Sequence, residues 1–262
     1  MLSCRAMEPA ILESLESGVL TLTLDRPARR NALDAATITA LHARLVAAGE
    51  DRAVRTVVLT GAGGAFSAGA DLKEAVAEPP TGDIIERAYH PTVRAMRRMP
   101  KPVVAAVDGV AAGFGASLAL AADVRLASPR ARFSLVFVRV GLTLDGGASW
   151  FLPRLVGLRA FELAMTGDLI AADEAERLGL VNHVYPEASF AAEVRAFARR
   201  LAAGPPRALA AIKANLNGAL AGALDATLED ERLAQRALFT SADFREGVAA
   251  FLGKRDAEFT GE

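Results

Sequence analysis

Apolar strand-like segments alternate with helix-like segments through the first half of the chain, and this alternation most constrains the fold. Residues 19–24 alternate apolar and threonine side chains, as a strand with one buried face does. Residues 103–107 are a continuous apolar run, which is typical of a strand buried on both faces. Because strands separated by helices can run in the same direction, this order predicts a parallel sheet with helical crossovers. The expected strands are residues 19–24, 54–60, 103–107 and 123–127, and the expected helices are residues 34–48, 83–99 and 116–121.

The second half of the chain has a different, helical pattern from about residue 160 onward. The run Gly204-Pro205-Pro206 interrupts it, and such runs break regular structure. We therefore expect an α/β core over residues 1–203 and a helical C-terminal region over residues 204–262. The expected helices of this half are residues 172–178, 188–202, 206–220, 224–238 and 241–252.

Composition excludes several classes of protein. Thirty basic and 31 acidic residues give a net charge of −1, whereas a nucleic-acid binder usually has a basic excess. Mean hydropathy is +0.25, yet Asp108 and several glycines interrupt the longest apolar stretch, so no membrane span is expected. The apolar excess therefore belongs in the core and in subunit interfaces. Cys4 is the single cysteine, which favours a reducing compartment and a cytoplasmic protein.

Metal and nucleotide sites find little support in the sequence. His42, His90 and His183 have no cysteine, histidine or carboxylate partner at ligand spacing, so no metal is expected. The turn at residues 61–64 begins like a dinucleotide-binding fingerprint, but Phe66 stands where the third glycine belongs.

Two glycine-rich turns, residues 66–72 and 113–117, each follow a predicted strand. Small residues let a backbone approach a ligand closely, and the first N–H groups of a helix have no internal acceptor. Two such groups aimed at one point would stabilise an oxyanion, although both turns could serve packing alone. Ser117 also stands in a partial nucleophile elbow, with Ala119 in place of the second glycine. A serine hydrolase is therefore a competing interpretation.

At these residues the chain resembles the crotonase superfamily, the enoyl-CoA hydratase/isomerase family, over nearly its whole length. The resemblance includes a Phe-x-Ala-Gly-Ala-Asp-Leu loop and a C-terminal Phe-x-x-Lys-Arg. Five such segments in the same order make the resemblance specific. They are residues 26–33, 66–72, 101–123, 166–182 and 251–255.

The resemblance implies an α/β fold with a crotonase-like ββα spiral core and a C-terminal α-helical trimerisation region. It implies an acyl-CoA thioester substrate, no separate cofactor, and a homotrimer or dimer of trimers. It assigns the oxyanion hole to the N–H groups of Ala68 and Phe114, where the family usually has glycine at the second position. The resemblance places Phe251 and Lys254 of the C-terminal segment against the coenzyme A nucleotide of a neighbouring subunit. The residues it places against coenzyme A or the acyl group are Ala28, Arg30, Ala68, Ala70, Asp71, Leu72, Phe137, Phe251 and Lys254.

The two glutamates of the family's hydratases are missing. Their positions hold Ser117 and Phe137, which cannot do general acid/base work near neutral pH. Asp145 lies in a segment that resembles the isomerase branch, which includes epoxyphenylacetyl-CoA isomerases, and it matches that branch's acid/base aspartate. Leu144 replaces the usual proline before it. Alternatively, Asp145 could be the N-cap of the following helix.

One carboxylate suffices to move a proton between two carbons of an enoyl thioester. We expect an apolar wall of Phe137, Phe114 and Trp150 to raise the pKa of Asp145 by desolvation. The expected function is an enoyl-CoA isomerase. The alternatives are a hydratase, a dehalogenase, a thioester hydrolase or a non-catalytic acyl-CoA-binding protein.

Overall fold

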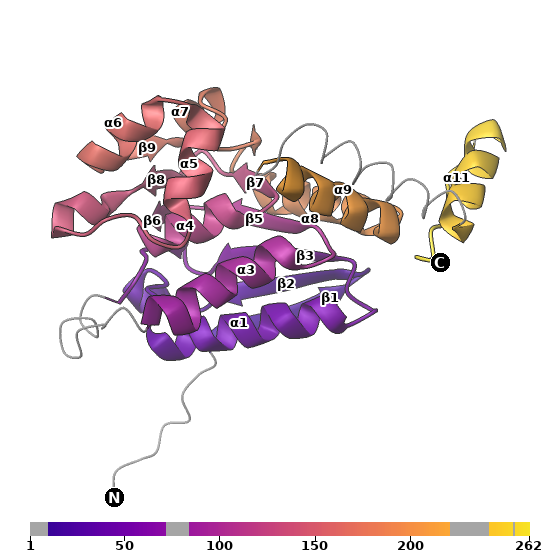
Figure 1. Ribbon diagram of the computed structural model, residues 1–262, viewed down its shortest axis with the longest axis horizontal. Coiled ribbons are helices and arrows are strands. Elements are labelled where there is room, and N and C mark those ends of the chain that lie inside the picture. Colours follow the sequence, from indigo (N-terminus) through magenta and orange to yellow (C-terminus); the bar gives the residue numbers. More distant parts are fainter. Residues whose placement is uncertain (1–9, 72–83, 221–240, 254) are drawn as a thin grey trace, which may run out of the picture.

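The chain forms two β sheets, and successive strands alternate between them through β3 to β8 (Figure 1). The computed structural model describes residues 10–71, 84–220, 241–253 and 255–262. The larger sheet has the order β1-β2-β3-β5-β7-β10 and the smaller one the order β4-β6-β8-β9. The strands are β1 (Ile11–Glu16), β2 (Val19–Leu24), β3 (Thr56–Gly61), β4 (Ala65–Ser67), β5 (Val103–Val107), β6 (Val110–Ala112), β7 (Val124–Ala127), β8 (Arg132–Ser134), β9 (Ile170–Ala171) and β10 (His183–Val184).

Successive strand pairs explain this order. β3, β5 and β7 lie side by side in the larger sheet, and the strands that follow them, β4, β6 and β8, lie side by side in the smaller one. Each ββα unit therefore adds one strand to each sheet, beside the strand of the preceding unit, so the chain winds as a spiral. In the larger sheet, pairing from β2 through β10 is parallel, as the sequence predicts, and β1 adds an antiparallel edge. In the smaller sheet β4, β6 and β8 pair parallel and β9 pairs antiparallel with β8.

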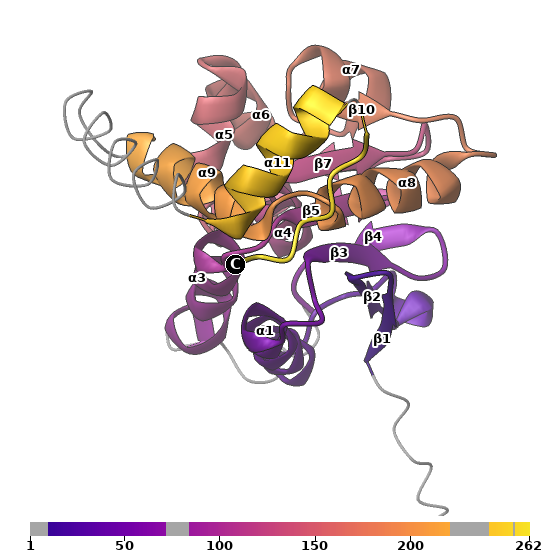
Figure 2. The same cartoon turned by 90° about the vertical axis from the view of Figure 1, so that its right-hand side faces the viewer.

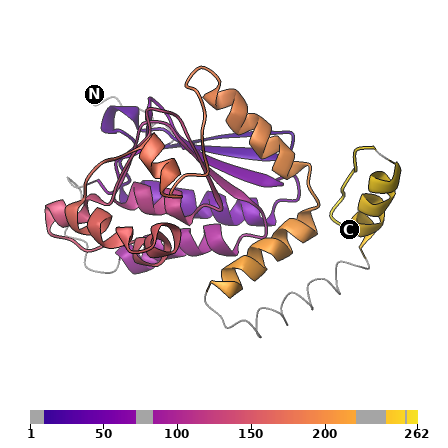
Figure 3. The ribbon, with the colours of Figure 1, turned by 90° about the horizontal axis from the view of Figure 1, so that it is seen from above.

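Helices pack against these sheets and complete each turn of the spiral (Figures 1 and 3). Asp34 caps α1, because its side chain accepts a hydrogen bond from the Thr37 N–H at 2.8 Å. The helices and helical turns are η1 (Pro27–Arg29), α1 (Ala35–Glu50), η2 (Ile85–Tyr89), α3 (His90–Arg98), α4 (Phe114–Ala121), η3 (Val136–Val140), α5 (Ala148–Val156), α6 (Arg159–Thr166), α7 (Ala172–Arg177), α8 (Phe190–Ala202), α9 (Pro206–Ala219) and α11 (Ala242–Gly253).

The segment predicted as one helix over residues 83–99 contains two kinds of helix, a π-helical turn followed by an α-helix. Its first turn, η2, is a π-helical turn in which the His90 N–H donates to the Ile85 carbonyl. Pro91 has no N–H to donate to the carbonyl of Arg87, so the regular α-helical ladder cannot continue through this point. The wider turn places the side chains of Ala88 and Tyr89 in the core.

The C-terminal region is helical, as expected. α11 lies at the opposite end of the molecule from α6, and the chain end runs back beside it (Figures 1 and 2). Asp243 holds this end, accepting a hydrogen bond from the Thr260 N–H at 2.7 Å. The helix predicted over residues 224–238 lies outside the described residues, and the boundary at residue 204 stays a prediction.

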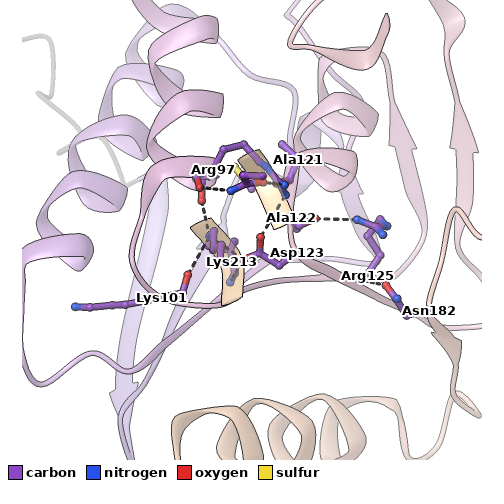
Figure 4. A network of polar contacts seen from close by, with 11 residues as sticks. Arg97, Lys101, Ala121, Ala122, Asp123, Arg125, Asn182 and Lys213 are labelled. Carbon is purple, nitrogen blue, oxygen red and sulfur yellow. Dashed lines mark hydrogen bonds and ion pairs between the residues drawn. The ribbon is translucent and has the colours of Figure 1, made fainter. Parts of the chain in front are cut away.

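A buried network of polar contacts joins α9 to the core (Figure 4). The Lys213 ammonium donates to the Met96 carbonyl and pairs with Asp123, both at 2.7 Å. Arg97 pairs with Asp123 at 3.2 Å, and Arg125 donates to the Ala122 carbonyl at 2.8 Å. The cations thus satisfy carbonyls at the C-terminal ends of α3 and α4, where positive charge is favoured.

Candidate active site

Asn31 organises the first glycine-rich turn. Its side-chain amide donates to the carbonyls of Ala62 at 2.9 Å and Ala65 at 2.7 Å, and its own carbonyl accepts from the Ser67 hydroxyl at 2.8 Å. Its φ of +55° is in the left-handed region, which asparagine tolerates better than most residues. One buried residue, through its side-chain amide at Ala65 and its main-chain carbonyl at Ser67, therefore holds both ends of β4.

The free N–H of this turn belongs to Ala70, and the prediction for Ala68 is wrong. The Ala68 N–H donates to the Arg30 carbonyl at 2.9 Å, so it is not available to a substrate. The Leu33 N–H donates to the Gly69 carbonyl at 2.8 Å, and the Leu33 carbonyl accepts from the Asp71 N–H at 2.9 Å. In this parallel bridge the N–H of Ala70 points to the other side, where no acceptor lies among the described residues.

The second glycine-rich turn meets the first at Gly69. A Cβ on Gly69 would lie 3.2 Å from the Phe114 nitrogen and 2.6 Å from the Ala112 carbonyl oxygen, and its φ is +92°. Only glycine fits there. α4 begins at Phe114, two residues earlier than the sequence predicts, so the Phe114 N–H is one of the helix's first donors without an internal acceptor. The turns thus bring the unpaired donors of Ala70 and Phe114 into neighbouring positions.

Asp145 lies on a loop that packs onto the first turn of α4. A Cβ on the next residue, Gly146, would lie 2.7 Å from the Ser117 Cβ and 2.8 Å from the Phe114 ring. One carboxylate oxygen of Asp145 is buried without a hydrogen-bond partner among the described residues. Burial raises the pKa of Asp145 to about 7. The sequence predicts this upward direction.

The capping alternative for Asp145 does not hold. α5 begins after Gly147, and no side chain makes a cap hydrogen bond there. Only the main chain of Asp145 takes part, its carbonyl accepting from the Ala148 N–H at 2.9 Å. The carboxyl group therefore does not cap α5.

Aromatic rings surround part of this region. The Phe114 ring is buried and stacks on Tyr89 with the ring centroids 4.0 Å apart, and Phe137 is also buried. Trp150 packs against the same core, and its ring lies under the Arg154 guanidinium at 4.2 Å and lines a cavity of about 550 Å³ beside α9, so its place in the wall stays a prediction. Tyr89 was not predicted from the sequence. The available signal was the adjacent His90-Pro91, because Pro91 interrupts the helical ladder at the wider turn that carries Tyr89.

The residues expected to contact coenzyme A lie beside the first turn. Ala28 and Arg30 are exposed, at and just after η1. Asp71 is buried and pairs with Arg29 at 2.7 Å and Arg26 at 3.4 Å, so its carboxylate orders this corner. Leu72 and Lys254 lie outside the described residues, as does the side chain of Phe251, which belongs to α11.

Ser117 is not an activated nucleophile. Its hydroxyl is fully buried and donates to the Asp145 carbonyl at 3.0 Å, while His183 lies against Tyr185 with ring centroids 5.8 Å apart. The described part of the chain contains no group of three or more histidine, cysteine or acidic residues placed to hold a metal. Nor does it contain a helix long and apolar enough to cross a membrane.

A ββα spiral with two unpaired backbone donors beside a buried carboxyl defines a class of protein suited to stabilising an enolate. The sequence pattern of the enoyl-CoA hydratase/isomerase family matches residues 14–262. The chain belongs to this family, the crotonases.

Individual relatives agree with the family. The chain is 42% identical to the 1,2-epoxyphenylacetyl-CoA isomerase of Escherichia coli (strain K12), over 96% of this chain and 98% of that protein. It is 46% identical to a protein of Rhodobacter capsulatus named "Probable enoyl-CoA hydratase", over 94% and 96% respectively. A crystal structure of an enoyl-CoA hydratase from Bacillus anthracis superposes with a TM-score of 0.92 at 32% identity, covering 97% of this chain and 100% of that one.

Proposed function

We propose that the protein is an enoyl-CoA isomerase that moves a proton between C2 and C4 of an unsaturated acyl thioester. Its substrate is a coenzyme A thioester, and it needs no separate cofactor. One observation carries this proposal: the half-buried carboxyl of Asp145, with one buried oxygen that has no partner among the described residues, lies on a loop packed against the helix turn that bears the Phe114 donor.

In this mechanism the Asp145 carboxylate takes a proton from C2 and returns it to C4. As the proton leaves, negative charge develops on the thioester oxygen, and the N–H groups of Ala70 and Phe114 stabilise it there. A pKa near 7 suits a group that must both accept and donate the proton near neutral pH. The oxyanion hole is thus revised from the expected Ala68 and Phe114.

The same residues disfavour hydration. Ser117 and Phe137 occupy the positions of the two hydratase glutamates, so no second carboxylate stands ready to activate water. The relative named as a hydratase supports the alternative, in which Asp145 alone directs water to the substrate. Crotonyl-CoA separates the two reactions, because a hydratase consumes its 2-enoyl absorbance rapidly and an isomerase of this kind does not.

Asp145→Asn tests the mechanism directly. We expect kcat for 3-enoyl-CoA isomerisation to fall by at least about 10³-fold, because a positioned acid/base group contributes ~10²–10⁴-fold. Acyl-CoA affinity, measured by calorimetry, should change by less than about 3-fold because the backbone donors remain. Asp173→Asn, an exposed change on α7, is the matched control. Undiminished turnover in Asp145→Asn would remove this carboxyl from the mechanism.

The substrate's acyl group and the assembly belong to the same proposal. The Escherichia coli relative favours an acyl group of the phenylacetyl type, so the substrate panel includes the epoxide named there beside linear 3-enoyl thioesters. We assign coenzyme A contacts to Ala28, Arg30 and Asp71 near η1, and to Leu72, Phe251 and Lys254. We also propose a cytoplasmic homotrimer, alone or paired, in which the C-terminal residues reach a neighbouring subunit.

A further inference from the structure

We propose that Ser117 is a positioning residue that fixes the loop carrying Asp145 onto α4 through a hydrogen bond to the Asp145 main-chain carbonyl. The inference rests on the proposed function, since it assigns the position of that site's acid/base group. It gives a role to the residue that occupies the place of a missing glutamate. Ser117 itself touches no reacting atom.

The hydrogen bond is well placed to do this. The Ser117 hydroxyl lies 3.0 Å from the Asp145 carbonyl oxygen and 3.4 Å from the Gly113 carbonyl oxygen. A hydroxyl has one proton to donate, so the shorter contact is its main bond. Because the side chain is fully buried, neither water nor another residue can readily replace that bond.

The contact of Gly146 with α4 completes the attachment. Ser117 is one helical turn after Phe114, so the two residues present the same face of α4. Gly146 lies against both, leaving no room for a Cβ, and its φ of +56° favours glycine. The residue that donates the oxyanion N–H and the residue that anchors the acid/base loop thus belong to one rigid turn. This arrangement fixes the separation between the carboxyl group and the Phe114 donor.

Water access, rather than a charged neighbour, controls the ionisation of Asp145. α4 carries no ionisable side chain. Arg139 of η3 pairs with Asp168 at 2.5 Å, and Arg154 of α5 lies over Trp150. In η2, Glu86 and Arg87 are exposed and Tyr89 stacks on Phe114. A loop released from Ser117 would admit water to the carboxyl group and lower its pKa.

Ser117→Ala tests this role in two independent measurements. We expect kcat to fall by about 10–100-fold with KM changed by less than about 2-fold, because small misplacements of a reacting group are costly. We also expect the pKa of Asp145, measured by carbon-13 NMR of the free protein with Asp145→Asn for assignment, to fall by about 1 or more. Ser117→Cys keeps a weaker donor in nearly the same volume and should give intermediate values.

Ser134→Ala is the matched control. Its hydroxyl is also buried and also donates to a loop carbonyl, that of Gly167 at 2.9 Å. It should lower stability comparably and leave the pKa of Asp145 unchanged. A native pKa and native kcat in Ser117→Ala would overturn the proposal, as would an equal pKa change in Ser134→Ala. Because the NMR measurement needs no turnover, a fall in pKa without any isomerase activity in the native protein would support the positioning role and reject the proposed function.

Discussion

Asp145 has an energetic cost that can be measured without any substrate. Its pKa is about 7 in the folded protein and near 3.8 when exposed, so between about pH 4 and 7 the folded state binds the extra proton. The contribution of Asp145 to stability must then decrease as pH rises through this window, by up to about 1.4 kcal/mol per pH unit. Asp145→Asn removes this dependence. We therefore expect its melting temperature to exceed that of the native protein by more at pH 8 than at pH 5, as followed by thermal unfolding. Parallel pH profiles for the two proteins would contradict the burial of this carboxyl.

Phe114 separates a backbone role from a side-chain role at one position. Phe114→Ala keeps the N–H donor but removes a buried ring and its stack on Tyr89, which should cost about 3–5 kcal/mol of stability. The space released beside Gly146 should also let the variant accept bulkier acyl groups. Chemical denaturation and a series of acyl-CoA substrates check both effects. A loss of turnover as complete as in Asp145→Asn, under conditions where the variant is folded, would show that the ring itself is needed.

At the scale of elements, the hydrophobic pattern predicted β2, β3, β5 and β7 and their parallel pairing, but neither the strands of the smaller sheet nor the loop geometry. Hydrophobic period alone located β2 and β5, because both strands bury their side chains in a predictable pattern. It could not say which N–H of the first glycine-rich turn is free. That depends on the pairing of Ala68 with Arg30 and of the flanking residues with Leu33, more than 30 positions earlier in the chain. The sequence identified Asp145 as a candidate but not its hydrogen bond from Ser117, because that bond joins α4 to a loop that only the fold brings beside it.

The buried network of Figure 4 makes a prediction about α9 as an element. Lys213→Met keeps much of the side-chain volume but removes the bonds to Asp123, Met96 and Lys101. Burial lowers the pKa of Lys213, yet its loss should still cost about 2–4 kcal/mol, because buried acceptors lose their donor. Urea unfolding measures this cost. Arg199→Met, which breaks an exposed pair with Glu16, is the control and should cost less than about 1 kcal/mol. Equal, small costs would mean that α9 is held by apolar packing alone.

For the whole molecule, the apolar excess of the sequence has two destinations. Much of it fills a core that runs from Ile11 to Val181 and contains the aromatic rings of the site, and a second cluster lies between the larger sheet and α8. The rest stays on the surface of the single chain, where Phe161, Met165 and Leu216 are all at least 60% exposed. The net charge of −1 provides no long-range attraction for an anion, so the proposed coenzyme A thioester requires a few placed cations.

Leu216 on α9 gives the sharpest test of assembly. Exposed apolar side chains on α9 favour burial against a second chain, and we expect the native protein to have three times the 27.4 kDa mass of one chain, or six times, by light scattering. Leu216→Glu should reduce the mass toward a single chain, because a carboxylate in an apolar interface loses its hydration without gaining a partner. Leu12→Glu changes an equally apolar residue on the β1 edge, 44% exposed and outside the C-terminal region, and should leave the assembly intact. A native protein with the mass of one chain would show that this interface does not form. An assembly broken by Leu12→Glu and not by Leu216→Glu would show that the interface lies elsewhere. Because Phe251 and Lys254 are proposed to reach a neighbour's site, dissociation by Leu216→Glu should also weaken acyl-CoA binding, which ties assembly to function in the same variant.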